Sequence, residues 1–473
     1  MSQRKWIPAI VGLILIVAIL TPVMSTGFTD LHKADSAFGA QDFSTASAYY
    51  LRAARVLFWR RDLIEKAGIA SARSGDFEAA TKLLNSAPRL TGEGWVWLCA
   101  SQVQLGRLDD AIPSCNAGIR EHESASLYRL LAMAYRDQGN MGAEQSALQN
   151  QLRLDSSDAY AHYRLGLLLT LSAPEQALDE LNLAASLDPE TASAVQTMSA
   201  ALSLSATQAE ASYAKVTIGR ALALVNEWEL AASAFEQATQ INEKNAEAWA
   251  WLGEAYQQLG QDGRAALDQA LRIDHTSVNV RALRALYWTR QKKYQQALAE
   301  YLLAAEFDPQ NPRWQMSLGE TYAITGDLVS ALTAFQRAVE LAPADPMYWR
   351  ALAMFCAEKG VHLEEIGMPA AQQAISLSPD DPQSLDVLGF VYFSTGRFAN
   401  AEQTLMQAIE KDSAYYPAHI HLALNYLAQG RRAEAFNALT LVRDTDTSGI
   451  YSETAAQLQI GRASCRERVC LYV

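Results

Sequence analysis

The sequence predicts an all-α fold, a solenoid of stacked helical hairpins preceded by one transmembrane helix. Three observations predict it. A Leu or Ile followed by a small residue recurs along the chain, in four cases 34 residues apart. A glycine follows many of these pairs at a constant distance, and a long apolar run lies near the N-terminus. A fixed period of this length is typical of repeat proteins, whose units bury their apolar faces only against their neighbours.

The first 24 residues predict a membrane anchor. Residues 1–5 carry Arg4 and Lys5, and the run that follows them, 6–24, is almost wholly apolar. A helix needs about 20 apolar residues to span a bilayer, and flanking basic residues tend to stay in the cytoplasm. We therefore expect a single-pass protein whose repeats lie outside the cytoplasm, in a bacterial cell envelope. A cleaved signal peptide is the alternative, and it would export the same part of the chain.

The pairs of a Leu or Ile with a small residue mark the first helix of each repeating unit. A Tyr often follows the first member by four residues, as at Tyr322 and Tyr392, so both side chains lie on one helix face. The small residue is expected to let the second helix of the unit approach closely. The pairs are Leu131–Ala132, Leu165–Gly166, Ile218–Gly219, Leu252–Gly253, Leu318–Gly319, Leu352–Ala353, Leu388–Gly389 and Leu422–Ala423.

Each unit also contains signals that end its helices. A glycine lies eight residues after the first member of the pair, where the left-handed conformation is expected to end the first helix. An alanine then opens a second amphipathic stretch, and a proline closes several units because it cannot continue a helix. The glycines are Gly106, Gly139, Gly260, Gly326, Gly360, Gly396 and Gly430, and the prolines are Pro189, Pro309, Pro343 and Pro379.

This pattern resembles the tetratricopeptide repeat family. The resemblance is strongest in Trp314–Pro343 and extends over about 33–446, in about a dozen units. It implies a right-handed superhelical solenoid of tetratricopeptide-like hairpins, whose first helices line an inner, concave groove. In the best unit the signature positions hold Leu318, Gly319, Tyr322, Gly326, Ala331, Phe335, Ala338 and Pro343.

Four stretches depart from the repeat. Residues 190–210 have no partner in the pattern and predict an extra helix, and 360–369 form an insertion between the two helices of their unit. Residues 449–459 predict a capping helix. The tail, 460–473, has no repeat period and resembles a translated sequencing adapter, so we expect it to be foreign to the protein. The sequence leaves open whether the natural chain continues past about residue 459.

Composition and motifs argue against catalysis and against several kinds of ligand. The 473 residues carry a net charge of −13, whereas a nucleic-acid-binding protein needs a basic surface. The sequence contains no GxxxxGK[ST] phosphate loop, no HExxH or CxxC metal motif and no GxSxG nucleophile elbow. His419 and His421 are two residues apart and point to different sides of a helix. We therefore predict no enzyme activity, no catalytic or metal-binding residue, no cofactor and no small-molecule substrate.

Two cysteines fall on the two helices of one unit. Cys99 takes the small-residue position after Leu98, so it is expected to face the second helix, where Cys115 lies. A disulfide between them is one alternative. We favour the other, in which both thiols stay reduced and pack as small apolar side chains.

The resemblance implies that partner proteins bind in the groove. In the last units several inward positions are apolar, and exposed apolar side chains often mark a binding surface. The alternative is that a tight superhelix or the capping helix covers them. The predicted groove residues are Met354, Phe390, Phe393, Leu424 and Leu427, with Tyr160 and Tyr163 on the same face farther back.

Together these features predict a membrane-tethered interaction scaffold or assembly factor. Its expected partners are proteins of unknown identity and, through the N-terminal helix, the membrane. Two alternatives stay open. One is a non-catalytic accessory subunit of an envelope glycosyltransferase or exopolysaccharide system. The other is the N-terminal part of a truncated multidomain enzyme, whose catalytic domain would follow about residue 459.

Overall fold

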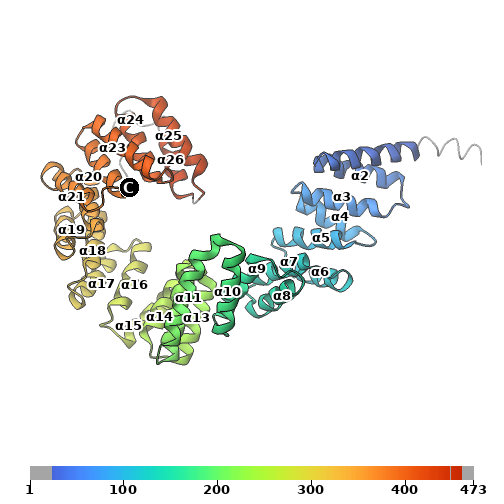
Figure 1. Ribbon diagram of the computed structural model, residues 1–473, viewed down its shortest axis with the longest axis horizontal. Helices are drawn as coiled ribbons and strands as arrows, with labels where there is room; N and C mark the ends of the chain where they lie inside the picture. The colour runs from blue at the N-terminus through green and yellow to red at the C-terminus, as the bar shows by residue number, and fades with distance from the viewer. Residues whose placement is uncertain (1–23, 448, 461–473) are drawn as a thin grey trace, which may run out of the picture. The chain divides into compact units, whose positions relative to one another are not determined.

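The computed structural model describes residues 24–447 and 449–460, and within them every regular element is a helix (Figure 1). The predicted all-α fold is therefore confirmed. A helix over 24–39 comes first. The helices that follow it are α2 (Phe43–Val56), α3 (Asp62–Arg73), α4 (Phe77–Ser86), α5 (Gly92–Gln104), α6 (Leu108–Glu121), α7 (Ala125–Asp137), α8 (Met141–Leu154), α9 (Ala159–Leu169), α10 (Pro174–Leu187), η2 (Pro189–Thr191), α11 (Ala192–Ala206), α12 (Ala211–Leu224), α13 (Trp228–Ile241), α14 (Ala246–Gln258), α15 (Arg264–Ile273), α16 (Val278–Arg290), α17 (Tyr294–Phe307), α18 (Pro312–Thr325), α19 (Leu328–Leu341), α20 (Pro346–Lys359), η3 (Leu363–Gly367), α21 (Met368–Leu377), α22 (Pro382–Ser394), α23 (Phe398–Lys411), α24 (Tyr416–Ala428), α25 (Arg432–Thr445) and α26 (Ile450–Ile460).

The predicted localisation, a single-pass protein with its repeats outside the cytoplasm, is corrected by these helices. A membrane-spanning helix needs about 20 apolar residues. Across the described residues, no helix combines that length with the apolar composition that a membrane crossing requires. The segment 6–24, on which the prediction depended, lies outside the described residues except for Met24. The anchor, the membrane as a partner and the envelope location are therefore not supported.

Most of the labelled helices pair into hairpins, such as α3 with α4, α18 with α19 and α22 with α23. First helices of neighbouring hairpins also touch, as α3 and α5 do, and as do α20, α22 and α24. No comparable contact joins the second helices of neighbouring hairpins in the part of the chain that the structure describes. The first helices therefore form the inner layer of each stack, and the second helices form the outer layer.

The stack divides into two compact units, with the boundary between Asn242 and Glu243. Unit 1 ends with α13, and unit 2 extends from α14 to α26. Each unit has its own buried apolar clusters. One cluster of unit 1 contains Tyr50 and Leu63, and one cluster of unit 2 contains Phe355 and Phe390.

In the five repeated pairs that contain glycine, the glycine faces a large side chain of the second helix. A Cβ atom added to Gly219 would lie 2.5 Å from a ring carbon of Phe235, and one added to Gly389 would lie 2.6 Å from Cγ of Leu405. Both distances are far inside van der Waals contact. The glycine is therefore needed for the close approach of the two helices, as the sequence predicted.

The turn that ends each first helix uses the left-handed conformation. All seven glycines predicted at this place have positive φ, between 66° and 85°. Gly326, with φ 85°, is the C-cap of α18. Three hairpins place another residue there: Gln41 has φ 61°, Asn226 has φ 62° and Lys292 has φ 56°. Because a side chain makes this conformation unfavourable, these three turns are strained where the glycine turns are not.

The C-terminal helix α26 is attached to the last hairpin by its N-terminus and its apolar face. The backbone N–H groups of Tyr451 and Ser452 donate to one carboxylate oxygen of Asp446, at 2.7 and 2.9 Å. Ala455 is fully buried, and Leu458 packs against the apolar cluster of α24 and α25. These contacts fix α26 beside the first helices that carry the predicted groove residues.

Candidate functional site

The predicted groove residues of unit 2 come from three first helices: α20 carries Met354, α22 carries Phe390 and Phe393, and α24 carries Leu424 and Leu427. Phe390 is 1% exposed, and Met354, Phe393 and Leu424 pack against the buried cluster to which it belongs. Leu427 packs against the next cluster along the stack, which Phe393 and Leu424 also contact. The structure therefore brings these residues together, but as the wall of the core rather than as a fully open surface.

A buried pair of ionisable residues, His421 and Asp386, packs against Phe390. The imidazole ring of His421 stacks on Phe390, with centroids 4.2 Å apart and planes 23° apart. Nδ1 of His421 lies 2.7 Å from a carboxylate oxygen of Asp386, which is 1% exposed. The hydroxyl of Tyr415 donates to the other oxygen at 3.5 Å, and burial raises the pKa of Tyr415 so that it keeps its proton. The pair holds the His421 ring, and with it the Phe390 ring, in one orientation.

His419 and His421 have separate partners. Nε2 of His419 donates to the backbone carbonyl of Ser413 at 3.0 Å, on another side of α24. Among residues 24–447 and 449–460 no group of three or more His, Cys, Asp or Glu side chains is placed to hold a metal ion.

A cavity of about 210 Å³ lies where the predicted groove residues meet α26. Met354 and Phe390 form one wall, and α26 contributes another with Ile450, Tyr451 and Thr454. Ile450 is 69% exposed, so this side of the cavity opens to solvent. The capping helix therefore covers part of the predicted groove and leaves a recess beside it. The complete lining is Met354, Glu358, Phe390, Pro417, Ile420, His421, Ile450, Tyr451 and Thr454.

Among the described residues that line this cavity, Glu358 alone carries a carboxylate. Its side chain makes no ion pair or hydrogen bond with any other described residue. The residue is exposed as a whole, yet burial raises the pKa of the Glu358 carboxyl group, against the opposing effect of the positive charge on Lys359. Glu320 on α18 is similar: it is exposed as a whole, burial raises its pKa, and it has no ion pair with another described residue. Sequence reasoning missed both, because an isolated Glu on a helix usually faces water.

The two tyrosines predicted as groove residues lie in unit 1 and form a different environment. The hydroxyl of Tyr160, which is 51% exposed, accepts a hydrogen bond from Arg136 at 2.8 Å. Arg136 also reaches Glu227 at 3.4 Å. Tyr163 is half-buried, and burial raises its pKa, with a further contribution from the charge of Glu227. The two tyrosines therefore lie beside charged groups that already have partners.

The charged groups beside these tyrosines form one network. Arg164 is 4% exposed and donates from Nε to Glu144 at 2.6 Å and from Nη1 to Glu227 at 2.6 Å. Glu144 is 2% exposed and accepts a second bond from Nη2 of Arg164 at 3.1 Å. Glu227 lies beyond the additional helix α11, so the network ties hairpins on both sides of that helix.

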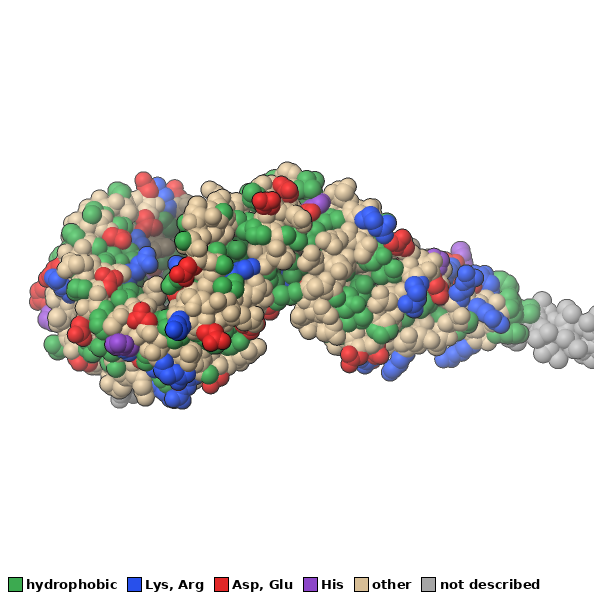
Figure 2. Space-filling view, turned by 90° about the horizontal axis from the view of Figure 1, so that it is seen from below, with side chains coloured by type: hydrophobic (Ala, Val, Ile, Leu, Met, Phe, Trp, Pro, Cys, Tyr) green, Lys and Arg blue, Asp and Glu red, His purple; other side chains and the backbone are tan. Residues whose placement is uncertain are grey.

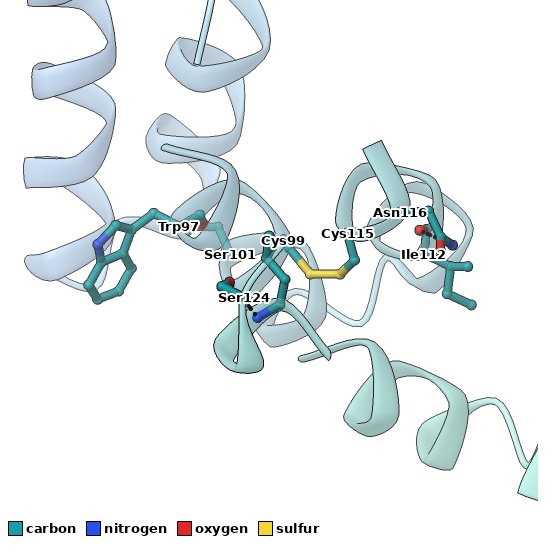
Figure 3. Close-up of a disulfide and its surroundings, with 8 residues drawn as sticks. Trp97, Cys99, Ser101, Ile112, Cys115, Asn116 and Ser124 are labelled. Atoms are coloured by element: carbon teal, nitrogen blue, oxygen red, sulfur yellow. Dashed lines mark hydrogen bonds between the residues drawn. A yellow bond between two sulfur atoms is a disulfide. The ribbon is translucent and has the colours of Figure 1, made fainter. Parts of the chain in front are cut away.

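The expectation of two reduced thiols in unit 1 is wrong. A disulfide joins Cys99 on α5 to Cys115 on α6, with Cα atoms 5.3 Å apart (Figure 3). The position that holds Gly or Ala in other hairpins brings the two helices close, so a cysteine there reaches the facing cysteine directly. In this hairpin the disulfide replaces the contact that a glycine makes with a large side chain in other hairpins, as Gly389 does with Leu405.

A larger recess, of about 640 Å³, lies in unit 1 between α4, α5 and α6, and none of the predicted site residues lines it. Trp95, which does, donates from Nε1 to Glu121 at 3.2 Å. On the face shown in Figure 2, acidic, basic and apolar side chains are interspersed over much of the surface, and basic side chains gather toward the N-terminal end of the described residues.

Three segments of the chain match models of one protein family. Residues 219–260 match the family described as "TPR repeat", and 286–346 and 382–415 match families described as "Tetratricopeptide repeat". These three segments are tetratricopeptide repeats, as the residue pattern predicted. Arrays of this repeat are typically non-catalytic and bind other proteins, which supports an interaction scaffold.

Solved structures of repeat proteins are similar to the chain at low identity. Yeast Tom70 is 15% identical with a TM-score of 0.42, and the alignment covers 93% of this chain and 96% of Tom70. The segment of MamA from Desulfovibrio magneticus RS-1 is 17% identical, with a TM-score of 0.30 and coverage of 37% and 97%. YrrB, described as a TPR protein with an unusual peptide-binding site, is 21% identical, with a TM-score of 0.32 and coverage of 40% and 96%. These TM-scores are too low to transfer a partner. None of the curated proteins matches the chain.

Proposed function

We propose that this protein is an interaction scaffold that binds a segment of a partner protein on the inner side of α20, α22 and α24. The observation that carries the proposal is the cavity of about 210 Å³ between Met354, Phe390 and α26. A preformed recess with apolar walls and a few polar groups is the usual form of a binding site. The repeat family, which typically binds proteins, supports the same function.

The wall of this recess combines a rigid part with an adaptable part. Phe390 is held between His421 and Phe393, with ring centroids 4.2 and 5.7 Å away. Met354 is half-buried, and its unbranched thioether can adjust to the shape of an incoming group. Because the rigid part is already ordered, the scaffold itself loses little conformational entropy on binding.

The proposal is tested by selecting phage-displayed random peptides on the full chain and mapping where they bind. A photo-crosslinking amino acid is placed at Ile450, which is exposed and lines the cavity, and in a matched variant at Gln372, which is exposed on the outer helix α21. We expect selected peptides to crosslink from position 450 and not from position 372. Peptides that crosslink equally from both positions, or failure to select any peptide, would show that the cavity is not the binding site.

A further inference from the structure

We infer that the cavity beside α26 receives a Lys or Arg side chain of the partner protein, with Glu358 as its counter-ion; this inference rests on the proposed scaffold function. The cavity is too small for a whole helix. At about 30 Å³ for each water molecule, 210 Å³ has room for about seven waters. That space suits one long side chain that projects from a segment bound outside the cavity.

The lining of the cavity matches the two chemical parts of a basic side chain. Met354, Phe390, Ile420 and Ile450 provide an apolar wall for the methylene stem. The Glu358 carboxylate lies at the same cavity and makes no ion pair or hydrogen bond with another described residue. Lys and Arg commonly bury the stem along apolar surface while the charged end finds a polar partner. An aliphatic partner residue would leave the carboxylate unpaired, and an acidic one would repel it.

The electrostatic state of Glu358 favours a cation. Burial raises the pKa of this carboxyl, which means that its charged form is poorly solvated where it stands. A cation that binds beside it compensates for the lost water with a charge-assisted hydrogen bond. The chain as a whole carries a net charge of −13, which also favours the approach of a basic segment.

His421 adds a second polar group that suits a donor with several N–H bonds. Its Nδ1 is held by the Asp386 carboxylate at 2.7 Å, and its Nε2 has no hydrogen-bond partner among the described residues. When Nδ1 of the neutral ring donates to Asp386, Nε2 is left as an acceptor. His421 is 9% exposed and lines the cavity, so this acceptor is largely shielded from water. An ammonium or guanidinium group has enough N–H donors for both Glu358 and His421.

The test uses the peptides selected on the full chain. In each peptide that crosslinks from position 450, every Lys or Arg is replaced in turn by norleucine, which keeps the stem and removes the charge. Each peptide is then titrated against wild type, Glu358→Gln and the matched control Glu320→Gln. Glu320 is also an inner-layer carboxylate without an ion pair, but it does not line this cavity.

We expect Glu358→Gln to weaken binding of the basic peptide by about tenfold, since a hydrogen bond to a charged group contributes about 1.5–3 kcal/mol and 1.4 kcal/mol is tenfold. Glu320→Gln should change it little. The Glu358→Gln effect should vanish for the norleucine peptide, which a general loss of fold would not produce.

Two results would overturn the inference in distinguishable ways. Peptides that crosslink from position 450 but bind Glu358→Gln as tightly as wild type would refute the counter-ion role and leave the scaffold function standing. If no peptide crosslinks from position 450, the proposed function fails, and the inference fails with it. Circular dichroism on each variant shows whether helical content is retained.

Discussion

Two sets of helices, α7–α9 in unit 1 and α20, α22 and α24 in unit 2, are joined by different chemistry. In unit 1, α7, α8 and α9 are connected by charged groups that satisfy one another: Arg164 bonds Glu144 and Glu227, and Arg136 bonds Glu227 and Tyr160. Because every member has a partner, this surface has little to offer a charged ligand.

In unit 2 the first helices α20, α22 and α24 meet through apolar side chains, the buried pair of His421 and Asp386, and the ion pair of Arg350 with Asp381. Glu358 has no ion pair with any residue that the structure describes, and it lies beside an open cavity. The comparison shows that the backbone fold of the hairpins does not determine whether their inner face can bind a charged ligand. That property depends on whether the charged side chains of the face find partners within the chain.

The largest effect is expected when the network of ion pairs around Arg164 in unit 1 is broken. Arg164→Ala leaves Glu144, which is 2% exposed, without its partner, and removing one member of a buried ion pair costs about 3–5 kcal/mol. Hydrogen exchange read on peptides from 24–242 and from 243–460 should show loss of protection in the first set only. Arg337→Ala, which removes an exposed pair with Glu340, should leave both sets unchanged. Equal loss of protection in the two sets would mean that the network does not stabilise unit 1 specifically.

A smaller effect is expected from the disulfide, which is present in unit 1 only among the described residues. Cys99 and Cys115 are 16 residues apart, and closing a loop of about 15 residues contributes about 3 kcal/mol. Replacing both with Ala, which other hairpins carry at the first of these positions, should lower the free energy of unfolding of unit 1 by about 2–4 kcal/mol. Urea unfolding with and without dithiothreitol provides the measurement.

The matched cysteine of unit 2 acts as the control for that experiment. Cys356 is buried, and burial raises the pKa of its thiol to about 11. It is therefore protonated and unreactive at neutral pH. If dithiothreitol destabilises the double-alanine variant as much as wild type, the reductant acts elsewhere and the disulfide contributes little.

Substitutions in the turns between paired helices should change the free energy of unfolding by about 1 kcal/mol. The sign of the change depends on whether the turn already holds a glycine. Gly326→Ala should destabilise unit 2, because φ is 85° at that position. Lys292→Gly should stabilise it, because lysine now adopts φ 56°. Thermal unfolding of the two single variants tests both signs, and a loss of stability in Lys292→Gly would show that the lysine side chain makes contacts that outweigh the strain.

The sequence was sufficient for features that arise within one hairpin. The constant spacing of Leu318, Gly319 and Gly326 predicted the helix, its close partner and its turn, because all three depend on neighbours in the chain. Contacts between hairpins could not be predicted in this way. His421 and Asp386 are 35 residues apart, and their meeting depends on the angle at which successive hairpins stack.

The candidate site was predictable only in its apolar part, for a similar reason. Phe390 and Met354 follow from the repeat register, but the cavity exists because α26 is placed beside them. That placement depends on Asp446, which no repeat motif marks. The apolar run at 6–24 also fitted a membrane helix by composition alone, yet the helices of the described residues gave that localisation no support.

The smallest predicted effect is a change in folding stability at acidic pH. It distinguishes the contribution of His419 from that of the carboxylates of unit 2. Burial lowers the pKa of His419 below 6.5, although the bond to Ser413 opposes the shift. A base whose pKa is lower in the folded state gives stability that is present above 6.5 and is lost as pH falls through the folded value. Glu320 and Glu358 have raised pKa values, so they make the folded state more stable as pH falls, and the total change with pH combines both effects.

The difference in urea midpoint between wild type and His419→Gln, measured from neutral pH to about pH 5, isolates the contribution of the histidine. Glutamine can still donate to Ser413 but binds no proton, so wild type should lose stability relative to the variant as pH falls. A difference that stays constant over this range would show that burial does not hinder protonation of His419.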